Sequence, residues 1–377
     1  MRIGFDVSST CQTRTGCAWY ADRLIRAMVA AAPEHHYALL HHFDRVNAGD
    51  PAKGTQISES HVSTPFDQYN ASQSVEMWEA IRGGACIGNG LEIVHSTSFQ
   101  APPLSPVKLV YTVFDITYWI VPEYTTEANR FFCQRGTLEA LKNADGLIFI
   151  SESARDEFEG LFPGWLAKRG IPHEVTALGG GERLLKQEER VPVARGEEFW
   201  LSVGALEERK NFEGMFDALE IYWEKSENPI RLKIAGGETP HTAHIKDRID
   251  RLEARGMVEY LGYVSEEELS ELYLSATALL FPSWYEGFGL PVLEAMSAGC
   301  PVITSHNTSI PEVAGKAALY IDPGSADTIA SAMLRIQEEP ETVKKLMRAG
   351  RERASGFTWS STAERTLNFY KRVLSDD

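Results

Sequence analysis

The feature that most constrains this chain is an alternation of short apolar runs, rich in β-branched residues, with longer amphipathic stretches. Parallel strands need a crossover connection, usually a helix, so this alternation predicts a parallel sheet with helices on both faces. In the first half the expected elements are Ile3 to Val7, Ala18 to Ala32, Tyr37 to Phe43, Leu91 to His95, Lys108 to Phe114, Glu127 to Lys142 and Leu147 to Ile150.

The alternation stops once and then restarts. Charged residues dominate from Glu182 to Glu198, directly after a triple glycine, and show no apolar period, so we expect an interdomain linker there. The chain of 377 residues is 43% hydrophobic, which is enough for two cores. We therefore predict a second doubly wound α/β domain. Its expected elements are Phe199 to Val203, Phe212 to Glu224, Arg231 to Ala235, Ala243 to Arg255, Val258 to Leu261, Glu266 to Ala276 and Ala278 to Phe281, followed by helices at Ala326 to Glu338, Pro340 to Ala354 and Ser360 to Leu374.

Charge and composition exclude several classes of function. The formal net charge of −16 repels polyanions, and the sequence has no basic block, so nucleic acid is not an expected partner. No run reaches the roughly 20 apolar residues that cross a membrane, and the first residues lack the apolar core of a signal peptide, so we expect a cytoplasmic protein. No C-x-x-C pair occurs, and reduced thiols are expected at Cys11, Cys17, Cys86, Cys133 and Cys300.

A glycine loop follows each domain's first predicted strand. In Thr13 to Ala18, Gly16 opens a helix, where backbone amides and the helix dipole favour a phosphate or sugar oxygen. A plain turn is the alternative. After Gly204 in the second domain, the adjacent cations Arg209 and Lys210 suit a diphosphate leaving group. A solvated surface pair is the alternative there.

The most informative segment runs from Phe281 to Met296. A strand is expected to end at Pro282, and a glycine-rich loop leads to a helix that begins near Leu290 or Pro291. The amides of Phe288, Gly289 and Leu290 would then point at a ligand from a helix N-terminus. Two carboxylates flank the turn, Glu286 before it and Glu294 inside the helix. Glutamates at this spacing can equally be solvated surface residues.

Taken together, these segments resemble the family 4 glycosyltransferases, which are retaining enzymes. Their hallmark is a glutamate, seven residues and a second glutamate, as in Glu286 to Glu294. The resemblance implies the GT-B fold, with two facing Rossmann-like domains and a deep interdomain cleft. It extends over nearly the whole chain, through Thr15-Gly16, Asp115, Ser151, Gly204 to Asn211, Gly262-Tyr263-Val264, both glutamates, Gly299-Cys300-Pro301-Val302, Pro311-Glu312-Val313 and Phe357-Thr358-Trp359.

The resemblance also implies domains and roles. Residues 1–182 would bind the acceptor, residues 196–359 the nucleotide sugar, and helix 360–377 would pack back on the first domain. Arg209 and Lys210 would clamp the donor diphosphate, and Glu294 would bind the nucleotide ribose. The implied catalytic residues are Glu286, beside the transferred sugar, Asp115, Arg209 and Lys210. The implied donor-binding residues are Gly16, Gly204, Arg209, Lys210, Tyr263 and Val264 beside the base, Phe288, Gly289, Leu290 and Glu294.

One position departs from the family pattern. Members usually carry His-Asp where this chain has Phe114-Asp115, and that histidine normally approaches the sugar or the acceptor. Asp115 remains available for the acceptor, although an aspartate that ends a strand often has a structural role. A front-side displacement, in which the departing phosphate takes the acceptor proton, would tolerate Phe114.

The remaining expectations concern ligands and partners. The sequence has no Asp-x-Asp motif, and side chains would balance the diphosphate, so no metal and no cofactor are expected. The resemblance is to bacterial mannosyltransferases of surface polysaccharide synthesis, which makes GDP-mannose the first expected donor and a UDP-hexose the second. The acceptor would be a glycan or a lipid-linked saccharide, with peripheral association at the inner membrane face. A nucleotide-sugar epimerase and a non-catalytic nucleotide-sugar-binding subunit are the alternatives.

Overall fold

The computed structural model describes residues 1–12, 16–43, 49–65, 73, 76–77, 79–80, 90–180, 196–239 and 242–375. Two compact units make up the chain, Met1–Gly179 with Trp359–Asp377, and Gly180–Thr358. The linker expected from Glu182 to Glu198 lies mostly outside the described residues. Within them, no helix is both long and apolar enough to cross a membrane. Four of the cysteines are free thiols, and Cys86 is not described.

The first unit contains a parallel sheet with strand order β3-β2-β1-β4-β5-β6-β7. Its strands are β1 (Arg2–Asp6), β2 (His36–Leu40), β3 (Val62–Ser63), β4 (Ile93–Ser96), β5 (Lys108–Val113), β6 (Gly146–Phe149) and β7 (His173–Val175). The described helices of this unit are α1 (Gly16–Ala31), α3 (Thr117–Ile120), α4 (Glu127–Asn143), α5 (Glu152–Leu161), α6 (Trp165–Arg169) and α14 (Trp359–Ser375), with 3₁₀ turns η1 (Ser8–Cys11), η2 (Pro51–Lys53) and η3 (Pro122–Tyr124).

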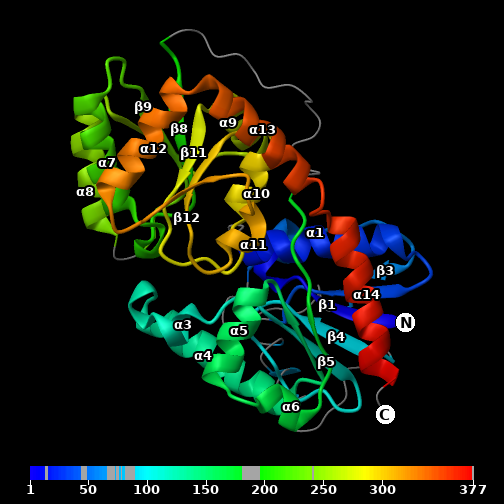
Figure 1. Ribbon diagram of the computed structural model, residues 1–377. Helices are drawn as coiled ribbons and strands as arrows, with labels where there is room; N and C mark the ends of the chain where they lie inside the picture. The colour runs from blue at the N-terminus through cyan, green and yellow to red at the C-terminus, as the bar shows by residue number, and fades with distance from the viewer. Residues whose placement is uncertain are drawn as a thin grey trace. The chain divides into compact units, whose positions relative to one another are not determined.

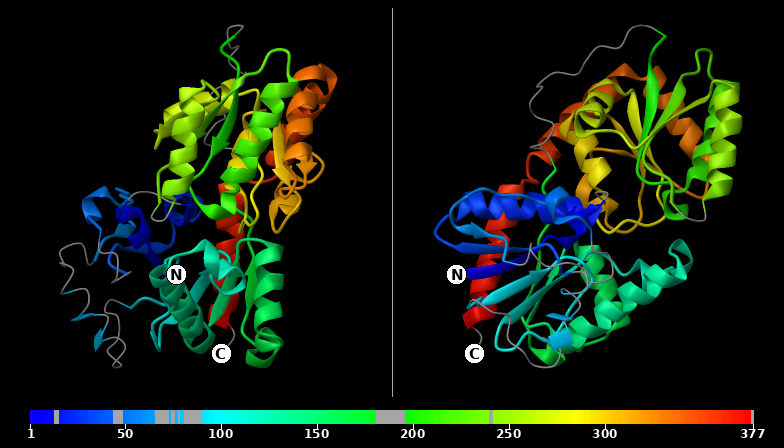
Figure 2. Two further views of the ribbon diagram at one scale, coloured as in Figure 1. Left: turned by 90° about the vertical axis from the view of Figure 1, so that its left-hand side faces the viewer. Right: turned by 180° about the vertical axis from the view of Figure 1, so that it is seen from behind.

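Helices cover both faces of this first sheet. On one face α4, α5 and α6 pack against the central strands in a cluster that includes Tyr111 and Phe149. On the other face α1 and α14 lie side by side (Figures 1 and 2). A buried polar network joins α14 to the sheet there. His95 Nδ1 lies 2.6 Å from the Tyr370 hydroxyl, and its Nε2 lies 2.6 Å from Thr112 Oγ1.

The second unit contains a parallel sheet with strand order β10-β9-β8-β11-β12-β13. Its strands are β8 (Phe199–Val203), β9 (Arg231–Ala235), β10 (Val258–Gly262), β11 (Ala278–Phe281), β12 (Val302–Ser305) and β13 (Leu319–Ile321). The described helices are α7 (Phe212–Lys225), α8 (Ala243–Ala254), α9 (Glu266–Ser275), α10 (Leu290–Ser297), α11 (Ile310–Ala314), α12 (Ala326–Glu338) and α13 (Pro340–Ala354), with one 3₁₀ turn, η4 (Glu208–Lys210).

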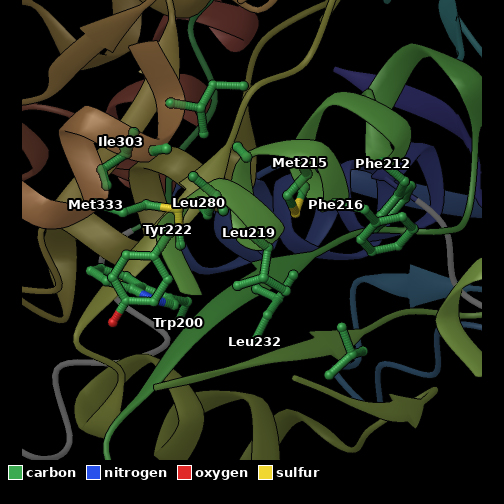
Figure 3. Close-up of a cluster of buried hydrophobic side chains, with 14 of the residues drawn as sticks. Trp200, Phe212, Met215, Phe216, Leu219, Tyr222, Leu232, Leu280, Ile303 and Met333 are labelled. Carbon is green, nitrogen blue, oxygen red and sulfur yellow. The ribbon is translucent and has the colours of Figure 1, made fainter. Parts of the chain in front are cut away.

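The core of the second unit explains why its strands appear in the sequence as apolar runs. Figure 3 shows Trp200, Phe216 and Tyr222 packed with Leu280 and Met333, so that β8, α7, β11 and α12 meet in one apolar layer. The opposite face of the sheet is covered by α9 and α10 (Figure 1). The central strands β8, β11 and β12 are therefore buried on both faces, and near-continuous apolar runs result.

The predicted α/β architecture with two parallel-sheet domains is confirmed. The helix expected at Ala326 to Glu338 has those bounds in the structure. The strand expected from Tyr37 to Phe43 was too long, because β2 ends at Leu40. The sequence pattern gave no sign of β3, β7 and β13, which are edge strands of two or three residues. Edge strands are commonly this short, and so few residues show no period.

Candidate functional site

The strand order of the second sheet reverses between β8 and β11. Loops that follow these two neighbouring strands leave in opposite directions, and the crevice between them is where open α/β sheets bind ligands. η4, which carries Arg209 and Lys210, follows β8. The loop with Glu286 follows β11. The topology therefore brings two segments that are distant in sequence to one edge of the sheet.

Three predicted site residues meet at this edge. Glu286 Oε1 accepts a hydrogen bond from Lys210 Nζ at 2.6 Å, and its Oε2 accepts one from Arg209 Nη1 at 2.8 Å. The side chains of Lys210 and Glu286 are only 9% and 7% exposed. Both carboxylate oxygens are thus engaged by cations in a largely buried cluster, which sequence reasoning did not foresee.

The protonation equilibria reflect this cluster. Burial alone would raise the pKa of Glu286, but the charges of Lys210 and Arg209 outweigh it and hold that pKa below its usual value. Burial, together with the Arg209 charge, lowers the pKa of Lys210 against the attraction of Glu286. The Lys210 ammonium also lies 4.7 Å from the centre of the Phe281 ring, a cation–π contact. Glu286 is therefore an ionised carboxylate held by two cations.

Hydrogen bonds fix the two loops to each other. The Trp284 amide donates to the Arg209 carbonyl at 2.8 Å, and the Asn211 side chain donates to the carbonyls of Pro282 and Pro323. Asn211 has a positive φ of 58° and caps α7, a conformation that asparagine tolerates better than most residues. Its place directly after Lys210 was the signal for this role, which the sequence analysis did not use.

Two further residues hold the backbone of Glu286. Its amide donates to Thr308 Oγ1 at 3.1 Å, and its carbonyl accepts from Ser309 Oγ at 2.8 Å. Both come from the loop after β12, the next strand in the sheet. Their contribution depends on strand order, and neither was a sequence-predicted site residue.

The predicted glycines of this unit stand where a side chain would not fit. Gly204 has a φ of 144°, and a Cβ there would lie 3.2 Å from Lys210 Cε. Gly289 has a φ of 104°, and a Cβ there would lie 2.7 Å from Ile310 Cδ1. Positive φ and close approach both require glycine at these positions.

Gly289 is the N-cap of α10, which begins at Leu290, one of the two starting residues that the sequence predicted. The amides of Phe288, Gly289 and Leu290 have no hydrogen-bond acceptor among the residues that the structure describes. With the positive end of the helix dipole, they are a candidate site for an anion. The Phe288 ring itself is buried, and its centre lies 6.1 Å from that of the Phe357 ring, so the side chain has a structural role. Only the amide of Phe288 is a candidate for ligand binding.

The second glutamate lies inside α10. Glu294 is half-buried and accepts a hydrogen bond from the Tyr273 hydroxyl of α9 at 2.9 Å. Tyr273 was not among the predicted site residues. Tyr263, 61% exposed, and the half-buried Val264 follow β10, an edge strand two positions from β8. These two do not join the Glu286 cluster, and an exposed ring there suits stacking against a planar group.

In the first unit, the predicted residues also follow strands at the carboxyl edge. Gly16 is the exposed first residue of α1, with no atom within 4 Å of the position of a Cβ, whereas Thr13 to Thr15 lie outside the described residues. Asp115 Oδ1 accepts from the amide and the hydroxyl of Thr117, at 3.0 and 2.9 Å, which stabilises the start of α3. Asp115 thus has a local structural role in addition to any catalytic one.

Phe114 replaces a polar residue with an aromatic contact. Its ring is buried and packs edge-to-face on Tyr20, with 5.1 Å between centres, and lies 5.8 Å from Phe99. Phe99 itself has a positive φ of 56°. The position therefore belongs to the apolar interior of the first unit.

A cavity of about 940 Å³ lies elsewhere in the second unit, between residues that precede the strands. Trp223, Asn228 and Gln337 are among the residues that line it. It lies at the edge of the sheet opposite to the Glu286 cluster, where parallel α/β sheets do not usually bind substrates. Over the described residues, no group of three or more histidine, cysteine or acidic side chains is arranged to hold a metal ion.

Comparison with known proteins places this site in a family. The model of the glycosyl transferases group 1 family matches residues 186–353. The O-antigen chain mannosyltransferase B of Escherichia coli is 31% identical over 286 residues, which cover 74% of this chain and 74% of that protein. The chain belongs to the glycosyl transferases group 1 family. The matched residues contain Arg209, Lys210 and both glutamates.

Two further comparisons are weaker in sequence identity and differ in how much of the chain they cover. The serotype-specific mannosyltransferase WbdA of Escherichia coli is 27% identical over 252 residues, which are 63% of this chain but only 30% of WbdA. Sucrose-phosphate synthase of Thermosynechococcus elongatus superposes with a TM-score of 0.70 at 21% identity, covering 100% of both chains. That similarity shows the fold, which is the GT-B glycosyltransferase fold of two parallel-sheet α/β domains.

Proposed function

We propose that this glycosyltransferase moves a mannosyl group from GDP-mannose, with retention of configuration, to a glycan or a lipid-linked saccharide of a cell-surface polysaccharide. The support for mannose is the O-antigen mannosyltransferase that is 31% identical across most of both chains. The family 4 motif, Glu286 to Glu294, supports retention. A UDP-hexose is the second candidate donor.

The observation that carries the proposal is the buried cluster of Arg209, Lys210 and Glu286 at the switch point of the sheet. Two cations, together with the amides at the start of α10 that have no acceptor in the described part of the chain, suit the diphosphate of a nucleotide sugar. We propose that Glu286 contacts the transferred sugar and that Glu294, whose carboxylate accepts a hydrogen bond from Tyr273, binds the ribose. Tyr263 and Val264 are proposed to flank the base.

The proposed chemistry is a front-side displacement. The bond between the anomeric carbon and the phosphate oxygen breaks while the acceptor hydroxyl forms its bond on the same face. The acceptor proton passes to the departing phosphate oxygen, whose charge Arg209, Lys210 and the α10 amides stabilise. No protein base is required, which is compatible with Phe114. In the first unit, we propose that the amide at Gly16 binds phosphate and that Asp115 binds the acceptor.

A panel of nucleotides tests the donor. GDP, UDP, GDP-mannose and UDP-glucose are compared by thermal shift, because a ligand that binds only the folded state stabilises it by about 2.7 kcal/mol at 100 times its Kd. GDP and GDP-mannose are expected to give the largest shifts, and mannosyl transfer to a saccharide acceptor is expected to continue in a chelator. A preference for UDP ligands would reject GDP-mannose, and loss of transfer in chelator would reject metal independence.

Two experimental outcomes would show that the protein is not a transferase. Conversion of the donor sugar to its epimer without any acceptor would identify an epimerase. Tight donor binding with neither transfer nor hydrolysis, across mannose and glucose donors and a panel of saccharide acceptors, would identify a non-catalytic subunit. The cytoplasm, with peripheral association at the inner membrane face, is the proposed location, and flotation with vesicles tests it.

A further inference from the structure

We propose that Glu286 is a built-in competitor of the donor: its carboxylate occupies the two cations that the diphosphate needs, and donor binding exchanges carboxylate for phosphate. This inference rests on the proposed function and specifies how its site works. It assigns to Glu286 a role in gating the diphosphate site, separate from any contact with the sugar.

The geometry of the cluster of Arg209, Lys210 and Glu286 is that of an occupied anion site. Each oxygen of Glu286 accepts one charged hydrogen bond, at 2.6 Å from Lys210 Nζ and at 2.8 Å from Arg209 Nη1. A phosphate group binds an arginine–lysine pair through the same two contacts, with two oxygens facing two donors. The carboxylate thus takes the place of a phosphate.

The charge balance points the same way. Arg209 also forms an ion pair with Glu207, Nε to Oε2 at 2.7 Å. Two cations therefore face two carboxylates, and the cluster carries no net formal charge. A site with no net charge gains little from binding a diphosphate. Withdrawal of one carboxylate restores a positive site, and Glu286 is the one that contacts both cations.

The anchoring of Glu286 allows its side chain to leave without a rearrangement of the loop. Thr308 and Ser309 hold the backbone amide and carbonyl of Glu286, and neither bond involves the carboxylate. In the proposed exchange the carboxylate leaves by rotation about its side-chain bonds, while these two backbone contacts stay in place. A carboxylate displaced by the β-phosphate stays tethered beside it, where the sugar of the same donor is attached. Donor binding would then both fill the clamp and deliver Glu286 to the sugar.

The alternative is that Glu286 only organises the two cations. The two roles predict opposite effects of Glu286→Gln, which keeps the shape of the side chain and removes its charge. If Glu286 only organises, nucleoside diphosphate affinity falls in the variant because the cations lose their fixed positions. If Glu286 competes, affinity rises by on the order of tenfold, the scale of the difference between a charge-assisted hydrogen bond and the weaker one that glutamine can form. Transfer activity falls in both cases.

Isothermal titration of the full chain with GDP and UDP decides between them. The matching nucleosides, guanosine and uridine, carry no phosphate and should bind the wild type and Glu286→Gln equally. Glu208→Gln is the matched control, because it removes a neighbouring carboxylate that pairs with His244 at 2.9 Å and is 46% exposed. We expect the control to change diphosphate affinity by less than about threefold, since an exposed pair contributes little.

A crystal structure of the wild type with the bound nucleoside diphosphate gives a test that needs no variant. The carboxylate of Glu286 is expected beyond ion-pair distance of Lys210, with phosphate oxygens in its place. Weaker or unchanged diphosphate binding in Glu286→Gln, or a Glu286–Lys210 pair that persists in the complex, would overturn the exchange and leave the proposed function standing. If no nucleoside diphosphate binds the wild type, both are overturned.

Discussion

Lys210→Met tests whether the buried cluster is as tightly coupled as its geometry indicates. Methionine has a similar length and no charge, so the change removes the ammonium while filling most of its space. Glu286 would keep Arg209 but lose its 2.6 Å partner. Breaking a buried pair from one side costs about 3 to 5 kcal/mol. The Arg209 contact that remains favours the lower end, so we expect a loss of about 3 kcal/mol in the free energy of unfolding.

The double variant Lys210→Met/Glu286→Leu separates stability from function. It removes both buried charges, and replacement of a buried pair by apolar residues is often neutral or stabilising. We expect it to recover most of the lost stability while transfer stays depressed by on the order of a hundredfold, the scale for one preorganised charge contact. Lys225→Met is the control, because Lys225 is 53% exposed and its pair with Asp327 spans 3.3 Å. Its expected cost is below about 1 kcal/mol.

Urea unfolding of the full chain, monitored by tryptophan fluorescence, measures these differences under one set of conditions, and transfer rates are measured alongside. A Lys210→Met variant within about 1 kcal/mol of the wild type would show that the pair is not coupled as described. A double variant less stable than the single variant would refute the argument from buried charge. Wild-type transfer in Lys210→Met would remove this lysine from the diphosphate clamp.

Three more outcomes follow from the structure. Tyr273→Phe removes the hydroxyl that donates a hydrogen bond to Glu294 and should weaken nucleoside diphosphate binding several-fold, the loss of about one hydrogen bond. Introduced into the Glu294→Gln variant, the same tyrosine change should have no further effect on binding measured by calorimetry. Gly289→Ala, at a φ of 104°, should lower the free energy of unfolding by about 1 to 3 kcal/mol and reduce diphosphate affinity; an unchanged urea midpoint would contradict the strain. Burial lowers the pKa of His95 to about 3, so below its unfolded pKa of 6.5 only the unfolded chain takes up the proton, and stability falls with falling pH by at most about 1.4 kcal/mol per unit. His95→Gln should flatten that slope between pH 6.5 and pH 4, and an unchanged slope in the variant would refute the assignment.

The helices and long strands could be predicted from sequence because their signals are local. The period of Ala326–Glu338 comes from one face that packs on the core, and Pro291 with Gly289 marks the start of α10. The glycines at 204 and 289 could be identified for a similar reason, since the loops that contain them follow strands. Edge strands such as β7 and β13 gave no such signal, because three residues cannot show a period.

The contacts within the site could not be predicted in the same way. The residue types of Arg209, Lys210 and Glu286 pointed to charge chemistry, but their pairing depends on β8 lying beside β11. Thr308, Ser309 and Tyr273 contact the two glutamates from other elements of the sheet and its helices, and nothing next to them in sequence marks them. From the sequence, Phe114 indicated only that an expected histidine was missing, whereas the structure shows its ring packed against Tyr20 and Phe99.

The two α/β domains and the residue types of the proposed donor site follow from the sequence alone, because hydrophobic period and turn chemistry act over a few neighbouring residues. Tertiary structure alone decided that Glu286 is held by both cations and that their cluster is neutral. That decision depends on strand order and burial, which bring residues from distant loops within 3 Å of one another and exclude the water that would otherwise separate their charges.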